Sequence, residues 1–264
     1  MNPEPYTPGY SHHATQFMAQ RHADSHAGFF IPYLKPEMSV LDCGCGPGSI
    51  TVDLATQLTE GYIIGIDINE SQIETAQNQG THLSNLHFQI ANVYDLPFDH
   101  GQFDAVFSHA LMEHLSEPIV ALQEIKRVLK PQGILGVCSP DWRGFIISPL
   151  TPALEAAINF YQKIQIENGG NPYIGAHLAT LMLKAGFNQV SANARYECYP
   201  DRELIGEYLA QQLECAPQLD KAIEKNLIKP QTLQEMIQAL RTWQHKPEGL
   251  FAQTWISAVG YVPR

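Results

Sequence analysis

A short run that ends in three closely spaced glycines constrains this chain more than any other feature. Residues 40–50 read VLDCGCGPGSI, so an apolar segment and Asp42 lead directly into Gly44, Gly46 and Gly48. Glycine accepts the positive φ values of a tight turn, and without a Cβ it lets a ligand approach the backbone closely. The run therefore predicts a strand, a ligand-binding turn and the start of a helix.

Strand and helix patterns alternate after this turn. Segment 118–130 has apolar residues at helical spacing, and Pro131 with Gly133 supplies the end of a helix. Short apolar or β-branched runs predict strands at 39–43, 62–67, 86–91, 103–108, 133–139, 188–199 and 251–262, with a further helix at 176–185. This alternation is typical of βαβ units, so we expect an α/β fold with a parallel sheet.

Composition and charge restrict the class of protein. The chain has 264 residues, of which 44% are hydrophobic and 16% charged, and this length fits one domain. The net charge of −11 counts against DNA or structured RNA as a partner. No apolar run approaches the roughly 20 residues that span a bilayer, and the N-terminal residues do not resemble a signal peptide. We expect a cytoplasmic protein with no membrane or nucleic-acid partner, and the sequence leaves its oligomeric state open.

Three segments fall outside the alternating core. Residues 142–173 and the largely helical 201–248 are interpreted as insertions, which usually shape the substrate side of an α/β site. Residues 1–20 are rich in Pro, Tyr and His, and they fit either a frayed tail or a flap over a ligand.

The spacing of the glycines separates two classes of nucleotide-binding turn. The dinucleotide fingerprint is G-x-G-x-x-G/A, whereas this chain has G-x-G-x-G and places Ser49 at the last fingerprint position. At Asp42, two residues before the first glycine, an anion suits a cationic ligand better than a pyrophosphate. Asp67 ends the second predicted strand, where a carboxylate can accept both hydroxyls of a ribose. NAD enzymes share that last feature, so Asp67 does not discriminate between the two classes.

Five motifs together carry a resemblance to a known family. They read LDCGCGPG, GIDIN, ANVYDLPF, FDAVFSHALMEHL and EIKRVLKPQGIL, and over residues 38–139 their order and spacing resemble class I S-adenosylmethionine-dependent methyltransferases. Within that class the chain resembles small-molecule methyltransferases of the ubiquinone and menaquinone biosynthesis type. The resemblance implies a Rossmann-like, mostly parallel seven-stranded sheet with an antiparallel last strand and helical insertions that cap the acceptor site. We expect one domain, 1–264, with a cofactor-binding core at 38–140 and a lid or helix at 1–30.

The same resemblance implies which residues bind S-adenosylmethionine and its product, S-adenosylhomocysteine. The glycine turn would line the methionine part with Asp42 near its ammonium, and Asp67 would hold the ribose. Asn92 would meet the adenine amino group, and the backbone N–H of Val93 would meet the ring. The family usually has Asp where Asn92 stands, so we expect somewhat weaker cofactor binding. Ser108 and His109 would flank the methionine moiety. The full set of residues predicted to bind the cofactor is Asp42, Gly44, Gly46, Gly48, Asp67, Ile68, Asn92, Val93, Ser108 and His109.

Candidate acceptor residues are few. His109 is a candidate general base or substrate contact, with a structural hydrogen bond as the alternative. Asp141 and Trp142 follow the fifth strand at its carboxyl end, where ligands of open α/β sheets bind. His13, in the N-terminal segment, is a further candidate substrate contact.

Two other patterns have ordinary structural explanations. His22 and His26 share one helical face, but a polar face or a lid is favoured over a metal site, so no metal is expected. Several aromatic residues are expected in the core rather than in a pocket wall, namely Phe145, Phe160, Tyr161, Phe251 and Trp255.

These features predict methyl transfer from S-adenosylmethionine to a small-molecule acceptor. The sulfonium activates the methyl group, so an in-line displacement mainly requires an oxygen, nitrogen or carbon nucleophile held on axis within roughly 3–3.5 Å. A general base is needed only where the acceptor must lose a proton. The alternatives are a protein or RNA acceptor, a non-catalytic module that binds S-adenosylmethionine, and an NAD-dependent oxidoreductase.

Overall fold

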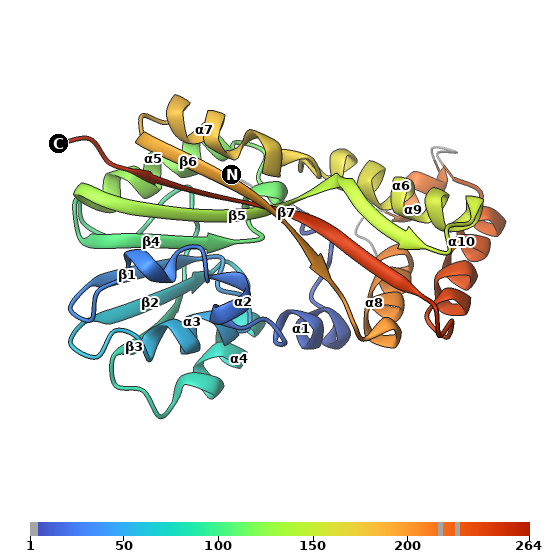
Figure 1. Cartoon of the computed structure of the whole chain (residues 1–264), viewed down its shortest axis with the longest axis horizontal. Coiled ribbons are helices and arrows are strands. Elements are labelled where there is room, and N and C mark those ends of the chain that lie inside the picture. Colours follow the sequence, from blue (N-terminus) through green and yellow to red (C-terminus); the bar gives the residue numbers. More distant parts are fainter. Residues whose placement is uncertain (1–4, 216–218, 225–227) are drawn as a thin grey trace.

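A single mixed sheet organises the protein. In residues 5–215, 219–224 and 228–264, which this computed structural model describes, seven strands are arranged in the order β3-β2-β1-β4-β5-β7-β6 (Figure 1). Strand β7 is antiparallel to β5 and β6, and the other neighbours are parallel. The strands are β1 Ser39–Cys43, β2 Tyr62–Asp67, β3 Leu86–Ile90, β4 Phe103–His109, β5 Leu129–Ser148, β6 Asn188–Cys198 and β7 Leu250–Tyr261. This arrangement confirms the predicted Rossmann-like sheet with an antiparallel last strand.

Helices flank the sheet, and their first residues follow capping rules. Asn69 and Asp201 accept the backbone N–H groups of Gln72 and Leu204, which stabilises the first turns of α4 and α8. The helices are α1 His12–Met18, α2 Ala23–His26, α3 Ser49–Ala55, α4 Glu70–Gly80, α5 Pro118–Val128, α6 Pro152–Glu167, α7 Leu178–Lys184, α8 Arg202–Glu214, α9 Leu219–Glu224 and α10 Pro230–Trp243, with 3₁₀ turns η1 Ile31–Tyr33, η2 Met112–His114 and η3 Ile174–His177. Within the described ranges, no helix is both long enough and apolar enough to cross a bilayer.

Alternate residues of the central strands face different cores. Leu41 of β1 belongs to the same core as Leu122 and Ile125 of α5, whereas its neighbour Val40 belongs to the core that contains Leu54 of α3. All five side chains are fully buried. Both faces of the central strands are therefore covered, and this burial explains the continuous apolar runs from which the strands were predicted.

The fifth strand is longer than its sequence pattern predicts. The pattern indicates a strand at 133–139 and an insertion from residue 142, whereas β5 continues to Ser148. After an irregularity that follows Asp141, residues 146–148 pair with residues 250–252 of β7. The hydrogen bonds that extend β5 come from a strand far away in the sequence, so the local pattern does not reveal the extension.

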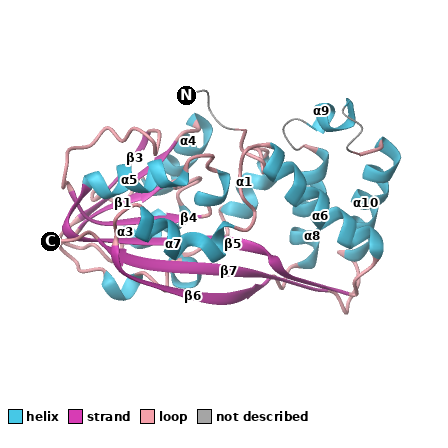
Figure 2. Cartoon of the chain, turned by 90° about the horizontal axis from the view of Figure 1, so that it is seen from above, coloured by secondary structure: helices cyan, strands magenta, loops and turns pink. Residues whose placement is uncertain are grey.

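Helices from the two predicted insertions gather at one end of the sheet (Figures 1 and 2). Helix α10 packs against both α6 and α8, and we refer to these three helices as the helical lobe. Their apolar core includes Leu240 and Trp243 of α10 together with Phe251 of β7, so the extended ends of β5 and β7 support the lobe. Residues 216–218 and 225–227 of the second insertion lie outside the described residues.

The N-terminal segment lies between the sheet and the helical lobe (Figure 2). Phe17 of α1 stacks on Tyr208 of α8 with ring centroids 4.0 Å apart. The Asn168 side chain donates to Thr7 Oγ1 at 3.0 Å, and Gln212 Nε2 donates to the carbonyl of Pro8 at 3.1 Å. From residue 5 onward, the predicted lid is therefore hydrogen-bonded to the lobe, whereas residues 1–4 lie outside the described residues.

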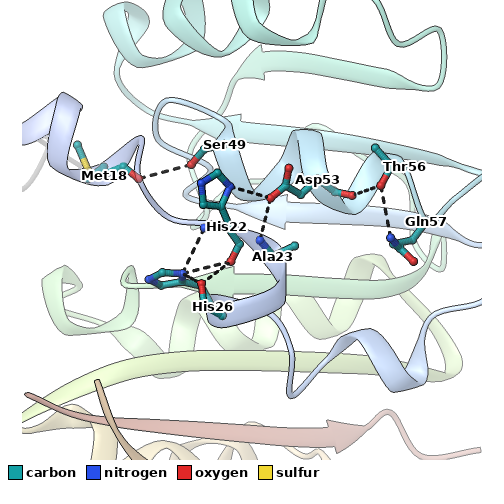
Figure 3. Close-up of polar contacts among 9 residues, drawn as sticks. Met18, His22, Ala23, His26, Ser49, Asp53, Thr56 and Gln57 are labelled. Carbon is teal, nitrogen blue, oxygen red and sulfur yellow. Dashed lines mark hydrogen bonds and ion pairs between the residues drawn. The ribbon is translucent and has the colours of Figure 1, made fainter. Parts of the chain in front are cut away.

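Further contacts tie this segment to α3 (Figure 3). The Asp53 carboxylate accepts the backbone N–H of Ala23 at 3.0 Å and lies 3.2 Å from Nδ1 of His22. Ser49 Oγ donates to the carbonyl of Met18 at 3.4 Å. Because Ser49 begins α3 directly after the glycine turn, these contacts hold the N-terminal segment beside that turn.

The packing around Gly48 generates a prediction for stability. This residue has a φ of 86°, and a Cβ there would meet Ala76 Cβ at 2.7 Å and Phe88 Cζ at 2.8 Å. Gly48→Ala combines left-handed strain with overpacking, so we expect it to lower the free energy of unfolding by roughly 3 kcal/mol. Urea denaturation measures this loss.

Gly101→Ala is the matched control. Gly101 also has a positive φ, 67°, but a Cβ there would meet only Lys130 Cα, at 3.8 Å. We expect roughly 1 kcal/mol of destabilisation from strain alone. Equal losses in the two variants would contradict the packing role of Gly48.

Candidate functional site

A cavity of about 320 Å³ opens at the carboxyl ends of the first four strands. Ligands of open α/β sheets bind at this edge, where the strand order switches direction: β2 and β3 follow β1 on one side, and β4 and β5 lie on the other. Of the ten residues predicted to bind the cofactor, eight line the cavity, namely Asp42, Gly44, Gly46, Asp67, Ile68, Asn92, Val93 and His109.

The glycine turn is fixed to the end of β2. The N–H groups of Gly44 and Cys45 donate to the carbonyl of Ile66 at 2.8 and 2.9 Å. Gly44 and Gly46 have φ values of 77° and 52°. A Cβ at Gly44 would lie 3.2 Å from Leu111, so the residue type is required both by the turn and by its neighbour.

Asp67 links the same turn to the cavity. One carboxylate oxygen accepts the N–H of Gly46 at 3.0 Å, and the other accepts the N–H of Asn69 at 2.9 Å. Burial raises the pKa of Asp67, and hydrogen bonds from the backbone partly offset this effect. The carboxylate is therefore held in one orientation at the cavity wall.

Asp42 is a buried acid near the end of β1, and it lines the same cavity as Asp67. Only 2% of it is exposed, and Thr51 Oγ1 donates to its carboxylate at 2.6 Å. Burial raises the pKa of Asp42 to about 7. A cationic ligand group beside it would favour its ionised form.

Asn92 lies just after β3, and its side chain is hydrogen-bonded within its own loop. Its side-chain oxygen accepts the N–H of Tyr94 at 3.0 Å. An amide oxygen has two lone pairs, so this bond leaves one acceptor site. Val93, beside it, is buried and contributes both to the cavity and to the apolar core.

Gly48 and Ser108 do not line the cavity, although both are in the predicted set. Gly48 packs on Ala76 and Phe88. Ser108 is 1% exposed, and its hydroxyl donates to the carbonyl of Cys43 at 2.9 Å, which ties β4 to β1. The structure therefore gives both residues a packing role one layer behind the cavity wall.

His109 ends β4 at the cavity and is almost fully buried. Its ring stacks on Trp255 with centroids 4.6 Å apart and meets the edge of His26 at 5.1 Å. In the described part of the chain neither ring nitrogen has a hydrogen-bond partner. Burial lowers the pKa of His109 well below its usual range, so the ring is neutral. A neutral imidazole offers one donor and one acceptor nitrogen to a ligand.

A smaller cavity of about 40 Å³ adjoins the first one. The two share Tyr6, Arg21, Ala110 and His114 as lining residues. Seven aromatic residues line the smaller cavity, which we call the aromatic chamber, namely Tyr6, Phe17, Trp142, Tyr161, Tyr199, Tyr208 and Trp255. They come from the N-terminal segment, β5, α6, the β6–α8 connection, α8 and β7.

Two titratable groups from η2 stand in the chamber wall. Glu113 is 3% exposed and accepts a hydrogen bond from Ser139 Oγ at 2.8 Å, and burial raises its pKa to about 7. His114 Nε2 lies 3.8 Å from a Glu113 oxygen, and burial lowers the pKa of His114 to about 3. Both side chains are therefore poised to be neutral near pH 7 or just below it.

The predicted acceptor residues lie in three different places. Trp142 lines the aromatic chamber. Asp141 lines neither cavity, because it pairs with the guanidinium of Arg143 and accepts the N–H of Ala176. His13 is exposed on α1 and also lies outside both cavities.

The histidines with helical spacing have separate partners. His22 lies against Asp53, whereas His26 Nε2 lies 3.0 Å from Glu197. Among the residues that the structure describes, no group of three or more potential ligands could hold a metal ion.

Sequence reasoning missed several lining residues. Tyr6 and Arg21 belong to the N-terminal segment, whose position the sequence left open. Glu113 stands in the MEHL motif, which follows β4 after a short turn. Its place near the carboxyl end of a strand could have identified it as a candidate site residue. Tyr161 and Trp255 are buried as expected, but they also line the chamber, so assigning them to the core alone was wrong.

Residues 34–195, more than half of the chain, match a family model described as a methyltransferase domain. An uncharacterized methyltransferase, C1B3.06c of Schizosaccharomyces pombe, is 25% identical over 260 residues, which is 93% of each chain. The O-methyltransferase resE of Aspergillus sclerotiorum is 32% identical over 56% of this chain and 54% of its own length. A demethylmenaquinone methyltransferase of Staphylococcus haemolyticus is 31% identical over 40% of this chain and 44% of its own length.

The fold is also found in solved structures. YcgJ protein from Bacillus subtilis has a TM-score of 0.61 at 17% identity, over 90% of this chain and 97% of its own. The match to the family model agrees with the cavity at the glycine turn, where most of the predicted cofactor residues meet. The chain therefore belongs to the methyltransferase domain family and is an S-adenosylmethionine-dependent methyltransferase.

Proposed function

We propose that this enzyme methylates a small molecule that meets the methyl donor at the junction between the larger cavity and the aromatic chamber. The observation that carries the proposal is the position of the chamber, which shares part of its wall with the larger cavity at the glycine turn. A methyl group can pass directly between ligands in two adjoining cavities, because in-line transfer needs only that donor and acceptor meet on axis.

The larger cavity fits the methyl donor. S-adenosylmethionine supplies a methyl group activated by its sulfonium and leaves as S-adenosylhomocysteine. In our proposal Asp67, fixed by two backbone N–H groups, accepts the ribose hydroxyls. Asp42 pairs with the ammonium, and Asn92 with Val93 contacts the adenine. The glycine turn leaves room for the methionine part because no Cβ fills the space.

Two findings favour a small molecule over a protein or RNA acceptor. The chamber is enclosed by seven aromatic rings, and its space of about 40 Å³ admits no segment of a folded protein or an RNA. Two relatives are named for an O-methyltransferase activity and for demethylmenaquinone. The assignment to the ubiquinone and menaquinone type, the cytoplasmic location and the absence of a nucleic-acid partner stay predictions from the sequence.

His109 is our proposed general base for acceptors that must lose a proton. Its ring is neutral, both of its nitrogens lack partners in the described part of the chain, and it faces the larger cavity. Stacking on Trp255, which lines the aromatic chamber, fixes the ring plane, so one nitrogen can accept a proton from an acceptor atom that reaches the larger cavity at the junction.

The proposed function is tested by following a labelled methyl group. Purified enzyme is incubated with methyl-labelled S-adenosylmethionine and a cell extract that has been separated into metabolite, protein and RNA fractions. We expect label in the metabolite fraction. Label confined to protein or RNA would contradict the proposal, and binding of S-adenosylmethionine without any transfer would favour a non-catalytic module.

Asp67→Ala is expected to weaken cofactor binding. The substitution removes a charge-assisted contact to the ribose and a partner of the Gly46 N–H. We expect the free energy of binding S-adenosylhomocysteine to fall by roughly 1.5–3 kcal/mol, as measured by calorimetry. Asp99→Ala removes the same charge from an exposed position and should leave the affinity unchanged. Equal affinities for the two variants would remove Asp67 from the cofactor site.

Cofactor affinity is expected to depend on the ionisation of Asp42. Burial raises the pKa of Asp42 to about 7, and only the ionised carboxylate pairs with an ammonium. Affinity for S-adenosylhomocysteine should therefore rise roughly tenfold between about pH 6 and about pH 8. Calorimetry at several pH values checks this expectation.

Two variants identify the titrating group. Asp42→Asn should bind more weakly and lose the rise, whereas Glu113→Gln should keep it. Glu113 is a suitable control because burial also raises its pKa to about 7, but it stands in the aromatic chamber. A rise that persists in Asp42→Asn and disappears in Glu113→Gln would contradict the assignment.

A further inference from the structure

We propose that residues 5–18, which we call the strap, close the larger cavity and the aromatic chamber together and open as one unit about residues 19–21. Loading of the methyl donor, entry of the acceptor and release of the products then share a single opening step. This inference rests on the proposed function, because it takes the junction of the two cavities as the place where donor and acceptor meet.

The strap contributes to the walls of both cavities. Tyr10 and Met18 line the larger cavity, and Pro8 and Phe17 line the aromatic chamber. Tyr6 lines both. The strap lies between the sheet and the helical lobe (Figure 2), so a movement of this one short segment changes access to both cavities.

Contacts within the strap hold it together as a unit. The Tyr6 ring stacks on Tyr10 with centroids 4.9 Å apart, and the Tyr6 hydroxyl donates to Sδ of Met18 at 3.5 Å. The side chain of Ser11 accepts the N–H of Ala14 and caps the first turn of α1. The two ends of the strap are thereby linked, because Tyr6 precedes α1 and Met18 ends it.

The chain that follows residues 19–21 is anchored to the body of the protein (Figure 3). Asp53 accepts the N–H of Ala23 at 3.0 Å, and His26 Nε2 lies 3.0 Å from a carboxylate oxygen of Glu197. Phe30 is fully buried in an apolar core beside the sheet. Residues 19–21 connect α1 to α2, so the strap can move about this connection while residues 23–30 stay in place.

Three buried side-chain amides hold the strap closed, and each donates one hydrogen bond to it. The pairs are Gln72 with Thr15 Oγ1 at 2.9 Å, Asn168 with Thr7 Oγ1 at 3.0 Å and Gln212 with the Pro8 carbonyl at 3.1 Å. The amide residues have exposed fractions of only 2%, 7% and 3%. They belong to α4, to the residue after α6 and to α8, so the strap is joined both to the sheet side and to the helical lobe.

The oxygen of each of these amides is left without a partner. In the described part of the chain five buried side-chain amide oxygens accept no hydrogen bond, and three of them belong to Gln72, Asn168 and Gln212. A buried acceptor without a donor carries an uncompensated desolvation penalty. When the strap opens, water can reach these oxygens, so the same three residues both hold the strap closed and favour its release. Ligand contacts with the strap then shift the balance toward the closed state.

Trypsin measures opening of the strap at Arg21, which is half-buried. Arg21 and Lys35 are the only lysine or arginine residues in 1–125, and Pro36 protects the bond after Lys35, so a cut at Arg21 gives a defined product in the mass spectrum. When closing is faster than cleavage, the cleavage rate follows the open population. Saturating S-adenosylhomocysteine should therefore slow this cut by about tenfold or more. A cleavage rate that the ligand leaves unchanged would overturn the proposal.

Thr7→Val tests the amide contacts away from the ligands. Arg21 lines both cavities and could be protected by direct contact, whereas Thr7 lines neither. The substitution leaves the Asn168 amide buried with no partner at all, so the cut at Arg21 and the release of labelled S-adenosylhomocysteine should both become roughly five- to tenfold faster. Thr242→Val is the matched control, because Thr242 also accepts a side-chain amide, from Gln238 at 3.4 Å, but on the exposed face of α10. Equal rates in the two variants would contradict the role of the strap.

Asn168→Leu, added to Thr7→Val, tests the contribution of the unpaired amide. The double variant has apolar groups on both sides of the contact and no trapped oxygen, and such a replacement costs little. We expect its cleavage and release rates to return to about the wild-type values. Rates as fast as those of Thr7→Val alone would show that the buried amide does not oppose closure.

Acrylamide quenching of tryptophan fluorescence tests whether the chamber opens together with the larger cavity. Trp142 and Trp255 line the chamber, and the third tryptophan, Trp243, is buried in the helical lobe. S-adenosylhomocysteine should reduce the quenching and Thr7→Val should increase it, in parallel with the cut at Arg21. Protection of Arg21 without any change in quenching would overturn joint closure, because the strap would then cover the cofactor alone.

Ligand binding separates failure of this inference from failure of the proposed function. If the wild-type enzyme does not bind S-adenosylhomocysteine, the proposed function fails, whereas the comparison of Thr7→Val with Thr242→Val in the absence of ligand still tests the strap. If the ligand binds but changes neither cleavage nor quenching, the inference is wrong and the methyltransferase assignment stands.

Discussion

The hydrogen bonds that hold the glycine turn against the end of β2 are the constraint on which the rest of the site depends. Gly44 and Cys45 donate to the Ile66 carbonyl, and Gly46 donates to the Asp67 carboxylate. The three glycines adopt their positive φ values without steric strain, but glycines lose more conformational entropy on folding than other residues, and these bonds offset that loss. They also give Asp67 two functions, because the carboxylate that orders the turn is the one that faces the cavity. Asp42, which is buried near the end of β1, adds a second carboxylate to the wall of the same cavity.

The aromatic chamber, on the proposed acceptor side, is assembled differently from the glycine turn. Its walls come from segments far apart in the chain, brought together because β5 and β7 extend beyond their neighbours and support the helical lobe. The N-terminal segment completes this arrangement, since it contacts α3 through Asp53 and α8 through Phe17 (Figures 2 and 3). One end of the sheet and the N-terminal segment form the larger cavity, whereas the aromatic chamber also needs residues of β7 and the helical lobe.

This difference explains what could be predicted from the sequence. The sheet follows from local patterns, and eight of the ten residues that the family resemblance predicts to bind the cofactor line the cavity, because each strand leads directly into the residues at its carboxyl end. Gly48 belongs to the same motif, yet it packs on Ala76 and Phe88 and does not line the cavity. A sequence motif shows that a glycine is required at a position, but it does not show whether a ligand or a neighbouring side chain requires it. Asp141 follows the expected strand end, but the longer β5 and the pair with Arg143 take it out of the site. No sequence motif marks Arg21 as a cavity residue. It lines the two cavities because elements remote in sequence meet there.

The central claim is that the methyl donor and the acceptor meet where the two cavities adjoin. A crystal structure of the enzyme with S-adenosylhomocysteine tests it most directly. We expect adenosine at Asp67 and Asn92 and a sulfur atom that faces the shared wall at Tyr6, Ala110 and His114. A ligand whose sulfur points away from the aromatic chamber, or one bound outside the glycine turn, would contradict it.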